Sequence, residues 1–232
     1  MSLIEHAFPG AALATGPAIA SSAPSASLAG GGAYRRGAKR LLDLLLVVML
    51  ALPVLAVLLP LVALVMLDGH SPFFVQERLG RGGRVFRMVK LRTMVPDAER
   101  VLADTLSADP AARAEWERHQ KLRRDPRITP VGALLRRTSL DELPQLANVA
   151  LGHMSMVGPR PMMPCQRSLY PGTEYFEMRP GVTGFWQVSA RNASSFAERA
   201  AFDRRYHAEL SLGTDLRVMW QTVGVVANAT GC

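Results

Sequence analysis

The segment Leu44-Leu-Leu-Val-Val-Met-Leu-Ala-Leu-Pro-Val-Leu-Ala-Val-Leu-Leu-Pro-Leu-Val-Ala-Leu-Val-Met-Leu67 decides the fold. Its 24 residues carry no charge and are dominated by Leu, Val and Ala. A run of roughly 18 apolar residues already favours a membrane helix over a buried core helix, so we predict that this segment enters a membrane. The whole chain is 49% hydrophobic and 20% charged, which excludes a disordered protein.

Basic residues lie on both sides of this segment, in the cluster 35–40 and again after residue 77. A helix that crossed the membrane would put one of these flanks on the wrong side by the positive-inside tendency, whereas a hairpin on the cytoplasmic face would not. Pro53 and Pro60 can each bend the helix to make such a turn. A helix from residue 39 to Pro53 rises only about 21 Å, short of a hydrocarbon core of about 30 Å. We predict a re-entrant helix over 34–68, although prolines also occur in simple spanning helices.

The rest of the chain divides into one domain and two tails. Residues 1–33 are rich in Ala, Gly, Ser and Pro and predict a disordered tail, and 228–232 form a second short tail. Between them, 69–227 predict one cytoplasmic domain. The cysteines Cys165 and Cys232 are far apart, which argues against a disulfide framework or a zinc site.

Alternating and turn-rich patterns predict a β-hairpin from 73–75 and 85–91, with the basic, glycine-rich stretch 78–84 between them. That stretch is either a plain hairpin turn or a phosphate cradle. Helices are predicted over 97–122 with an interruption at Pro110 and a cap at Asp109, over 196–207, and over 215–226. The predicted fold class is α/β, mainly α: a membrane helix, amphipathic interfacial helices and a short β-hairpin.

The net charge of +8 is concentrated in the middle of the chain, where 69–140 hold 15 basic and 8 acidic residues. This excess indicates an anionic partner such as phosphates, nucleic acid or an acidic membrane surface, or else a solvated basic face. A nucleic-acid-binding module is disfavoured because no helix-turn-helix, RNP-type or zinc pattern is present. A non-catalytic adaptor that binds anionic lipids needs only the membrane helix and this charge, and it stays open as an alternative.

Asp141 and Glu142 follow Arg136 and Arg137 closely and precede an apolar segment. One interpretation is structural, because Ser139-x-x-Glu142 is the pattern of a helix capping box. The other is catalytic, because an Asp carboxylate can attack phosphorus while Mg²⁺ and arginines neutralise the phosphates. The residues alone leave both open.

Several short motifs follow one another along the chain: Lys39-Arg40…Asp43, Gln76-Glu-Arg78, Lys90-Leu-Arg-Thr-Met94, Asp125-Pro-Arg-Ile-Thr129, Thr138-Ser-Leu-Asp-Glu-Leu-Pro-Gln-Leu146, Gly158-Pro-Arg-Pro161, Arg179-Pro-Gly-Val-Thr-Gly184 and Arg191-Asn192. This order resembles the bacterial sugar transferase family, the monotopic polyprenyl-phosphate phosphoglycosyl transferases, over about 35–227. The long middle helix and the Gly-Phe-Trp-Gln187 stretch are similar to its exopolysaccharide-initiating branch.

The resemblance implies transfer of galactose or glucose 1-phosphate from a UDP-hexose to undecaprenyl phosphate, with release of UMP. It places the protein on the cytoplasmic face of the bacterial inner membrane, among inner-membrane lipids and without nucleic acid, and it allows a homo-oligomer. The family's membrane element is a re-entrant helix. Its members often have Ser-Pro where this chain has Leu52-Pro53, so which proline makes the turn is open.

For the site, the resemblance implies Asp141 as covalent nucleophile and Glu142 as its partner, both beside Mg²⁺. It also implies that mostly basic side chains bind the substrate and its phosphates: Lys90, Arg92, Arg136, Arg137, Arg160, Gln187 and Arg191. The family usually has an acid where this chain has His153, and the role of this histidine is left open.

Overall fold

The computed structural model describes residues 31–119, 122–189 and 196–227. The predicted tail 228–232 and residues 1–30 of the other lie outside this range, while Gly31–Ala33 form a short helix, α1. The first part continues through a π-helical turn at Tyr34–Ala38, α2 at Lys39–Val65, a 3-10 turn at Met66–Asp68, β1 at Phe73–Leu79, a 3-10 turn at Arg81–Gly83 and β2 at Val85–Leu91. The middle part contains α3 at Ala98–Ala108, α4 at Pro110–His119, α5 at Pro130–Thr138, a 3-10 turn at Leu140–Glu142 and α6 at Gln145–Ala150. The last part contains β3 at Ser155–Val157, a 3-10 helix at Pro164–Leu169, α7 at Glu174–Glu177, β4 at Gly181–Thr183, α8 at Phe185–Val188, α9 at Arg199–Glu209 and α10 at Leu212–Ala227.

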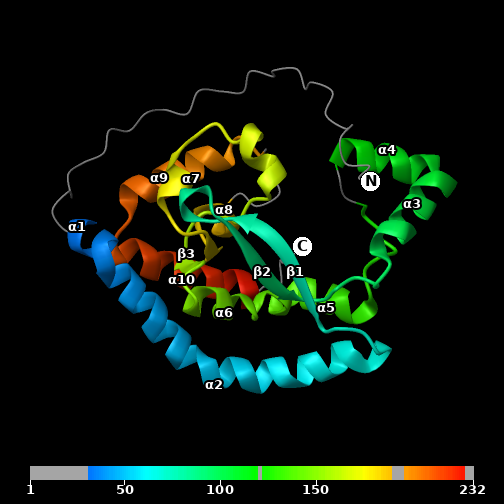
Figure 1. Cartoon of the computed structure of the whole chain (residues 1–232), viewed down its shortest axis with the longest axis horizontal. Coiled ribbons are helices and arrows are strands. Elements are labelled where there is room, and N and C mark those ends of the chain that lie inside the picture. Colours follow the sequence, from blue (N-terminus) through cyan, green and yellow to red (C-terminus); the bar gives the residue numbers. More distant parts are fainter. Residues whose placement is uncertain (1–30, 120–121, 190–195, 228–232) are drawn as a thin grey trace.

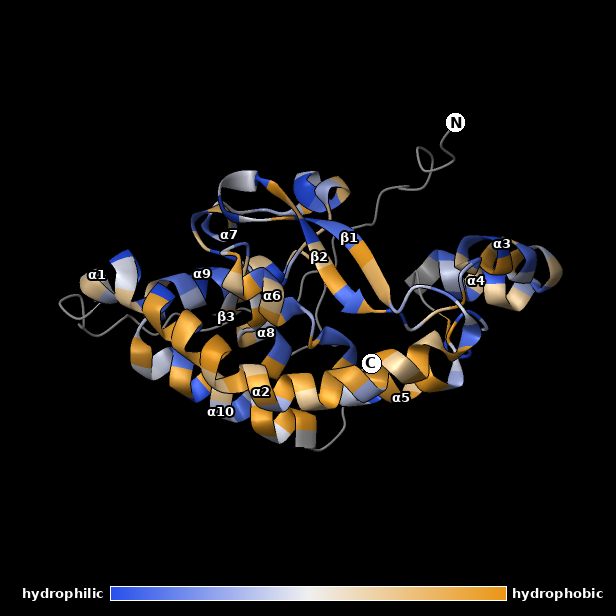
Figure 2. Ribbon diagram, turned by 60° about the horizontal axis from the view of Figure 1, so that its bottom comes forward, coloured by the Kyte–Doolittle hydropathy of each residue, from blue (hydrophilic) through white to orange (hydrophobic). Residues whose placement is uncertain are grey.

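The apolar segment forms most of α2, which is helical throughout and contains both Pro53 and Pro60. The helix bends near its middle, where Pro53 lies (Figure 1), because proline removes a backbone N–H and crowds the preceding turn. The prediction of a bend is confirmed, but the helix is not broken into two arms. Many of its leucines are exposed, with Leu52 78% and Leu59 64% exposed, while Leu58 and Leu61 pack against the domain. Figure 2 shows that α2 is hydrophobic along its length and runs along the lower side of the molecule in that view. By length and composition, α2 and its flanking turns are one helix that could cross a membrane.

The beginning of α2 is tied to the domain by charged side chains. Lys39 Nζ lies 2.6 Å from the buried Asp215 carboxylate, and Arg40 donates to the carbonyls of Val149 and Ala150. Asp43 is buried and accepts hydrogen bonds from Ser155 Oγ and the Met156 N–H. From the sequence, Asp43 is expected either to pair with Lys39 and Arg40 or to reach water. The second expectation is wrong because Asp43 is buried in the domain, while the charge of Lys39 still acts on its carboxylate.

The end of α2 is tied to the same domain. Arg92, just after β2, makes a two-pronged ion pair with Asp68, in which both N···O distances are 2.7 Å. Its guanidinium also donates to the carbonyls of Val65, Ser71 and Met94. Both ends of the apolar helix therefore contact one folded body.

The predicted hairpin is confirmed: β1 and β2 pair antiparallel from Phe73↔Leu91 to Leu79↔Val85. Gly82 and Gly83 in the turn have φ values of 70° and 74°, which glycine adopts at no steric cost. A second, parallel pair of three-residue strands, β3 and β4, was not predicted from the sequence.

Most predicted helices are present with shifted ends. Asp109 Oδ1 accepts from the N–H groups of Ala111 and Ala112, so the predicted cap before Pro110 is confirmed. In α10, one stripe is exposed rather than packed in the core: Leu212, Leu216, Trp220, Val223 and Val226 are between 43% and 78% exposed. This exposed apolar stripe belongs to a helix that lies on the same lower side of the molecule as α2 (Figure 2).

Candidate active site

The acidic pair lies in a tight turn between two helices. Thr129 caps α5 by accepting from the Gly132 N–H, and α5 ends at Thr138, before Ser139, which adopts a left-handed conformation with φ 58°. Asp141 and Glu142 follow in a 3-10 turn, and no side chain caps this turn. The capping-box interpretation of Ser139 and Glu142 is therefore wrong, because the next helix begins only at Gln145.

A lysine from β2 holds the two acids. Lys90 Nζ lies 2.6 Å from Glu142 Oε1 and 3.9 Å from Asp141 Oδ2. Burial raises the pKa of Asp141 more than Lys90 lowers it. Burial acts in the same direction on Glu142, but the charges of Lys90 and Arg160, together with hydrogen bonds from Lys90 and Gln145, outweigh it and lower the pKa of Glu142. The pKa of Asp141 is thus raised while that of the neighbouring Glu142 is lowered. Such opposite shifts are typical of two carboxyl groups that have different roles in one active site.

Two of the predicted arginines approach this pair. Arg136 donates from Nε to Thr93 Oγ1 at 2.9 Å, and its positive charge works to lower the pKa of Asp141. The positive charge of Arg160, from the Gly158-Pro-Arg-Pro161 stretch, helps to lower the pKa of Glu142. Lys90, Arg136 and Arg160 therefore surround the acids with positive charge, as a site for phosphate groups requires.

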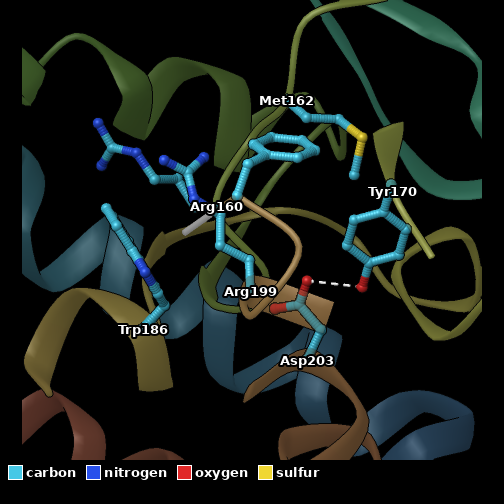
Figure 3. A pocket seen from close by; sticks show the side chains of 7 residues that line it. Arg160, Met162, Tyr170, Trp186, Arg199 and Asp203 are labelled. Carbon is cyan, nitrogen blue, oxygen red and sulfur yellow. Dashed lines mark hydrogen bonds between the residues drawn. The ribbon is translucent and has the colours of Figure 1, made fainter. Parts of the chain in front are cut away.

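Arg160 also belongs to a cluster of arginines and aromatic rings (Figure 3). The Trp186 ring lies 5.2 Å from the Arg160 guanidinium and 4.3 Å from that of Arg199. Burial and the nearby charges of Arg160 and Arg199 lower the pKa of Arg78 to about 10. Arg199 and Arg78 were not singled out from the sequence as substrate-binding residues. Gln76-Glu-Arg78 is one of the motifs that carry the family resemblance. No local pattern indicates that Arg199 lies in the same cluster.

Other predicted residues lie elsewhere or carry no site contact. The guanidinium of Arg92 donates to Asp68 and to backbone carbonyls, so the structure favours a structural role over the predicted binding of substrate. Arg137 is exposed on α5, and Gln187 is half-buried in α8 beside Trp186. Arg191 lies outside the described residues. His153 faces Phe86 at 5.8 Å between ring centroids and lines a basic hollow at the other end of the hairpin.

Asp203, on α9, lies in the small pocket of Figure 3 and accepts a hydrogen bond from Tyr170 Oη at 2.8 Å. Burial raises the pKa of Asp203 to about 7. The folded state therefore favours the protonated carboxyl, so the contribution of Asp203 to stability falls as pH rises from about 4 to about 7 and is constant above.

We expect Asp203→Asn to remove this pH dependence, because the amide still accepts from Tyr170 but carries no charge. The variant should be more stable than the parent above pH 7, by about 4 kcal/mol at most, and equal to it near pH 4. Thermal unfolding of both proteins in a neutral detergent at pH 4.5 and pH 8 measures the difference. Parallel pH profiles for the two proteins would contradict the assignment.

Comparison with known proteins places this site in a class. The chain belongs to the bacterial sugar transferase family, whose model matches residues 34–229. It is therefore an enzyme of the transferase class. Asp141, Glu142, Lys90, Arg136 and Arg160 all lie within the matched region.

Particular relatives make the class more specific. The chain is 46% identical to the UDP-galactose-lipid carrier transferase of Erwinia amylovora over 198 residues, which cover 83% of this chain and 41% of that protein. It is 44% identical to the exopolysaccharide production protein ExoY of Sinorhizobium fredii over 191 residues, 79% of this chain and 84% of that one. It is 45% identical to the undecaprenyl-phosphate galactose phosphotransferase of Salmonella typhimurium over 166 residues, 71% and 35%. The chain thus spans most of ExoY but less than half of the other two proteins.

Proposed function

We propose that this enzyme transfers a hexose 1-phosphate, galactose or glucose, from a UDP-hexose to undecaprenyl phosphate. The products are undecaprenyl-diphosphate-hexose and UMP, and the reaction is the first membrane step of exopolysaccharide synthesis. The observation that carries the proposal is the buried Asp141 next to Glu142, enclosed by Lys90, Arg136 and Arg160. The names of the Erwinia and Salmonella relatives support galactose, and that of ExoY supports the pathway.

The chemistry proceeds through two displacements. An Asp141 carboxylate oxygen forms a bond to the β-phosphorus of the UDP-hexose as the bond to the UMP oxygen breaks. A phosphate oxygen of undecaprenyl phosphate then attacks the same phosphorus, and the bond to Asp141 breaks, which restores the carboxylate. Lys90 and the two arginines reduce the repulsion between Asp141 and the anionic diphosphate.

Mg²⁺ fits this site. Among the described residues no three acidic, His or Cys side chains gather, but Mg²⁺ is usually held by one or two carboxylates together with substrate phosphates. Asp141 and Glu142 are two such carboxylates, and they would hold the ion. When bound, Mg²⁺ would neutralise charge on the diphosphate and on the UMP leaving group.

We also propose that α2 is re-entrant and that the domain lies on the cytoplasmic face of the inner membrane. A straight crossing would carry Lys39 to the opposite side from Asp68, yet both ends of α2 bind the same body through Asp215 and Arg92. The exposed stripe of α10 would lie in the membrane interface beside α2. This places Asp141 where a cytosolic sugar nucleotide and a lipid phosphate can both arrive.

The test uses the full chain in nanodiscs that contain undecaprenyl phosphate, with UDP-galactose, UDP-glucose and their N-acetylated analogues as donors. We expect one lipid product heavier by a hexose phosphate, identified by mass spectrometry. Without acceptor, the covalent route predicts a burst of UMP that equals the amount of enzyme. UMP release that strictly requires the acceptor would contradict the covalent step. Full cellular function of an Asp141→Asn chain would favour the non-catalytic adaptor.

A further inference from the structure

A second, larger hollow lies at the opposite end of the hairpin from the acidic pair. Its volume is about 1210 Å³. It lies between the beginning of α2, the hairpin turn and the residues around α7 and α9, and its basic side chains are Arg35, Arg36, Lys39, Arg40, Arg81, Arg84 and Arg179. Lys90 reaches the acidic pair from the far end of β2, whereas Arg84 precedes the near end. Arg84 and Lys90 are six strand positions apart at about 3.3 Å each, or about 20 Å, so the hollow is distinct from the active site.

The positive charge of the hollow is not balanced by the carboxylates that line it. Asp43 is buried and bonded to Ser155 and to the Met156 N–H, and Glu177 pairs with His207 at 2.9 Å. Lys39 is neutralised by Asp215 behind it. Within the described part of the chain, no salt bridge joins the six arginines of the hollow to a carboxylate. Seven Lys and Arg side chains thus line the hollow together with only two carboxylates, so it carries an excess of positive charge.

Two of these arginines are held in place by backbone rather than by acids. Arg40 donates to the carbonyls of Val149 and Ala150, and Arg179 donates from Nε to the carbonyl of Gly152 at 2.8 Å. Burial together with the like charges of Arg40 and Arg81 lowers the pKa of Arg179. Like charges are thus fixed near one another before any ligand binds, which is the arrangement expected of a preorganised anion site.

The same turns of α2 also carry exposed apolar side chains, with Leu41 60% and Leu45 55% exposed. A basic hollow beside an exposed apolar helix suits a ligand that has an anionic head and apolar tails. Basic pockets at the cytoplasmic end of membrane helices bind anionic lipid headgroups by this combination. A volume of this size exceeds what one phosphate ion would fill and accommodates a whole headgroup.

We propose that this hollow binds the headgroup of an anionic phospholipid whose acyl chains lie along the start of α2. The site would fix the beginning of α2 in the interface and leave the active site free for its own lipid phosphate. The inference rests on the proposed membrane placement of α2, but not on the chemistry of Asp141.

The experiment measures which lipids the purified full chain retains from an equimolar mixture of phosphatidylglycerol and phosphatidylcholine with identical acyl chains, by native mass spectrometry. We expect the parent protein to retain phosphatidylglycerol at least tenfold over phosphatidylcholine. Arg81→Glu/Arg84→Glu, on the exposed hairpin turn, should lower this ratio at least tenfold, since each arginine near an anionic surface contributes about fivefold. The matched control is Arg123→Glu/Arg124→Glu, an equal charge change at exposed positions outside the hollow, and it should leave the ratio unchanged.

Several outcomes would overturn the proposal. A parent ratio near one would mean that the hollow does not select anionic lipid, and an equal loss in the control pair would mean a diffuse charge effect. Displacement of phosphatidylglycerol by equimolar glycerol 3-phosphate would assign the hollow to free phosphate compounds instead. If the hairpin variant fails to fold, Arg35→Glu/Arg36→Glu on the opposite wall repeats the test. A protein that retains neither lipid would refute the membrane placement, whereas a preserved ratio in Asp141→Asn with no transfer would leave both proposals standing.

Discussion

Replacement of Asp141 by Asn is expected to lower hexose-phosphate transfer by about three orders of magnitude or more without loss of stability. An amide lacks the anionic oxygen that attacks phosphorus, so the covalent route is closed. Burial raises the pKa of Asp141, so the charged carboxylate is a cost to the folded state that the neutral amide avoids. The unfolding temperature of the variant should therefore equal or exceed that of the parent near pH 7. Initial rates with UDP-galactose, measured beside thermal unfolding, test both expectations.

Glu142→Gln is the informative comparison for this change. The pKa of Glu142 is lowered in the fold, and its carboxylate is the partner of Lys90 at 2.6 Å. Loss of that charge should destabilise the protein at pH 7, in contrast to Asp141→Asn. Transfer by Asp141→Asn within tenfold of the parent rate would refute the role of Asp141 as nucleophile, whatever the stability of the variant.

Gly132→Ala is expected to cause a large loss of stability for so small a substitution. A Cβ on Gly132 would lie 2.8 Å from Thr93 Cα and closer still to the Thr93 carbonyl oxygen. That carbonyl accepts from the Thr129 N–H, and the hydroxyl of Thr93 holds Arg136. Backbone cannot move aside as a side chain can, so we expect a loss of about 3 kcal/mol or more together with loss of transfer.

The matched control for Gly132→Ala is Gly224→Ala in α10, where an added Cβ meets nothing within 4 Å. There the helix should gain about 0.5–1 kcal/mol, because alanine is the better helix former. Chemical denaturation of both variants in the same detergent measures the difference. A Gly132→Ala protein as stable as the parent would mean that α5 and the end of β2 can separate without cost.

Features set by short stretches of sequence were predicted well. The strand 85–91 was predicted with its observed ends, and the Asp109 cap before Pro110 is present, because alternation and capping are local effects. The pair of β3 and β4 was missed, since three-residue strands far apart in sequence carry no local pattern. The burial of Asp43 was missed for the same reason: its hydrogen-bond donors Ser155 and Met156 lie more than 100 positions away.

The site shows the same division. Asp141 and Glu142 were recognised through their motif, but local reasoning left a capping box open, and it is excluded because Ser139 makes no side-chain cap and the next helix begins only at Gln145. Arg92 is part of a recurring motif, yet its ion pair with Asp68 depends on where α2 ends. Arg199 reaches the Trp186 ring through tertiary packing alone. Motifs therefore identified the reactive groups, while the long-range fold decides which basic side chains face them.

The contacts at the two ends of α2 bear on how the protein is made and handled. Asp215 binds Tyr34, Lys39 and Tyr206, and Arg92 forms an ion pair with Asp68. The hydrophobic helix is therefore part of the folded structure of the enzyme. A truncated version that begins after residue 68 would leave Asp215 and Arg92 without the counter-charges that the helix supplies. Solubilisation of this enzyme is therefore better pursued with surfactants or nanodiscs than by cutting away its hydrophobic part.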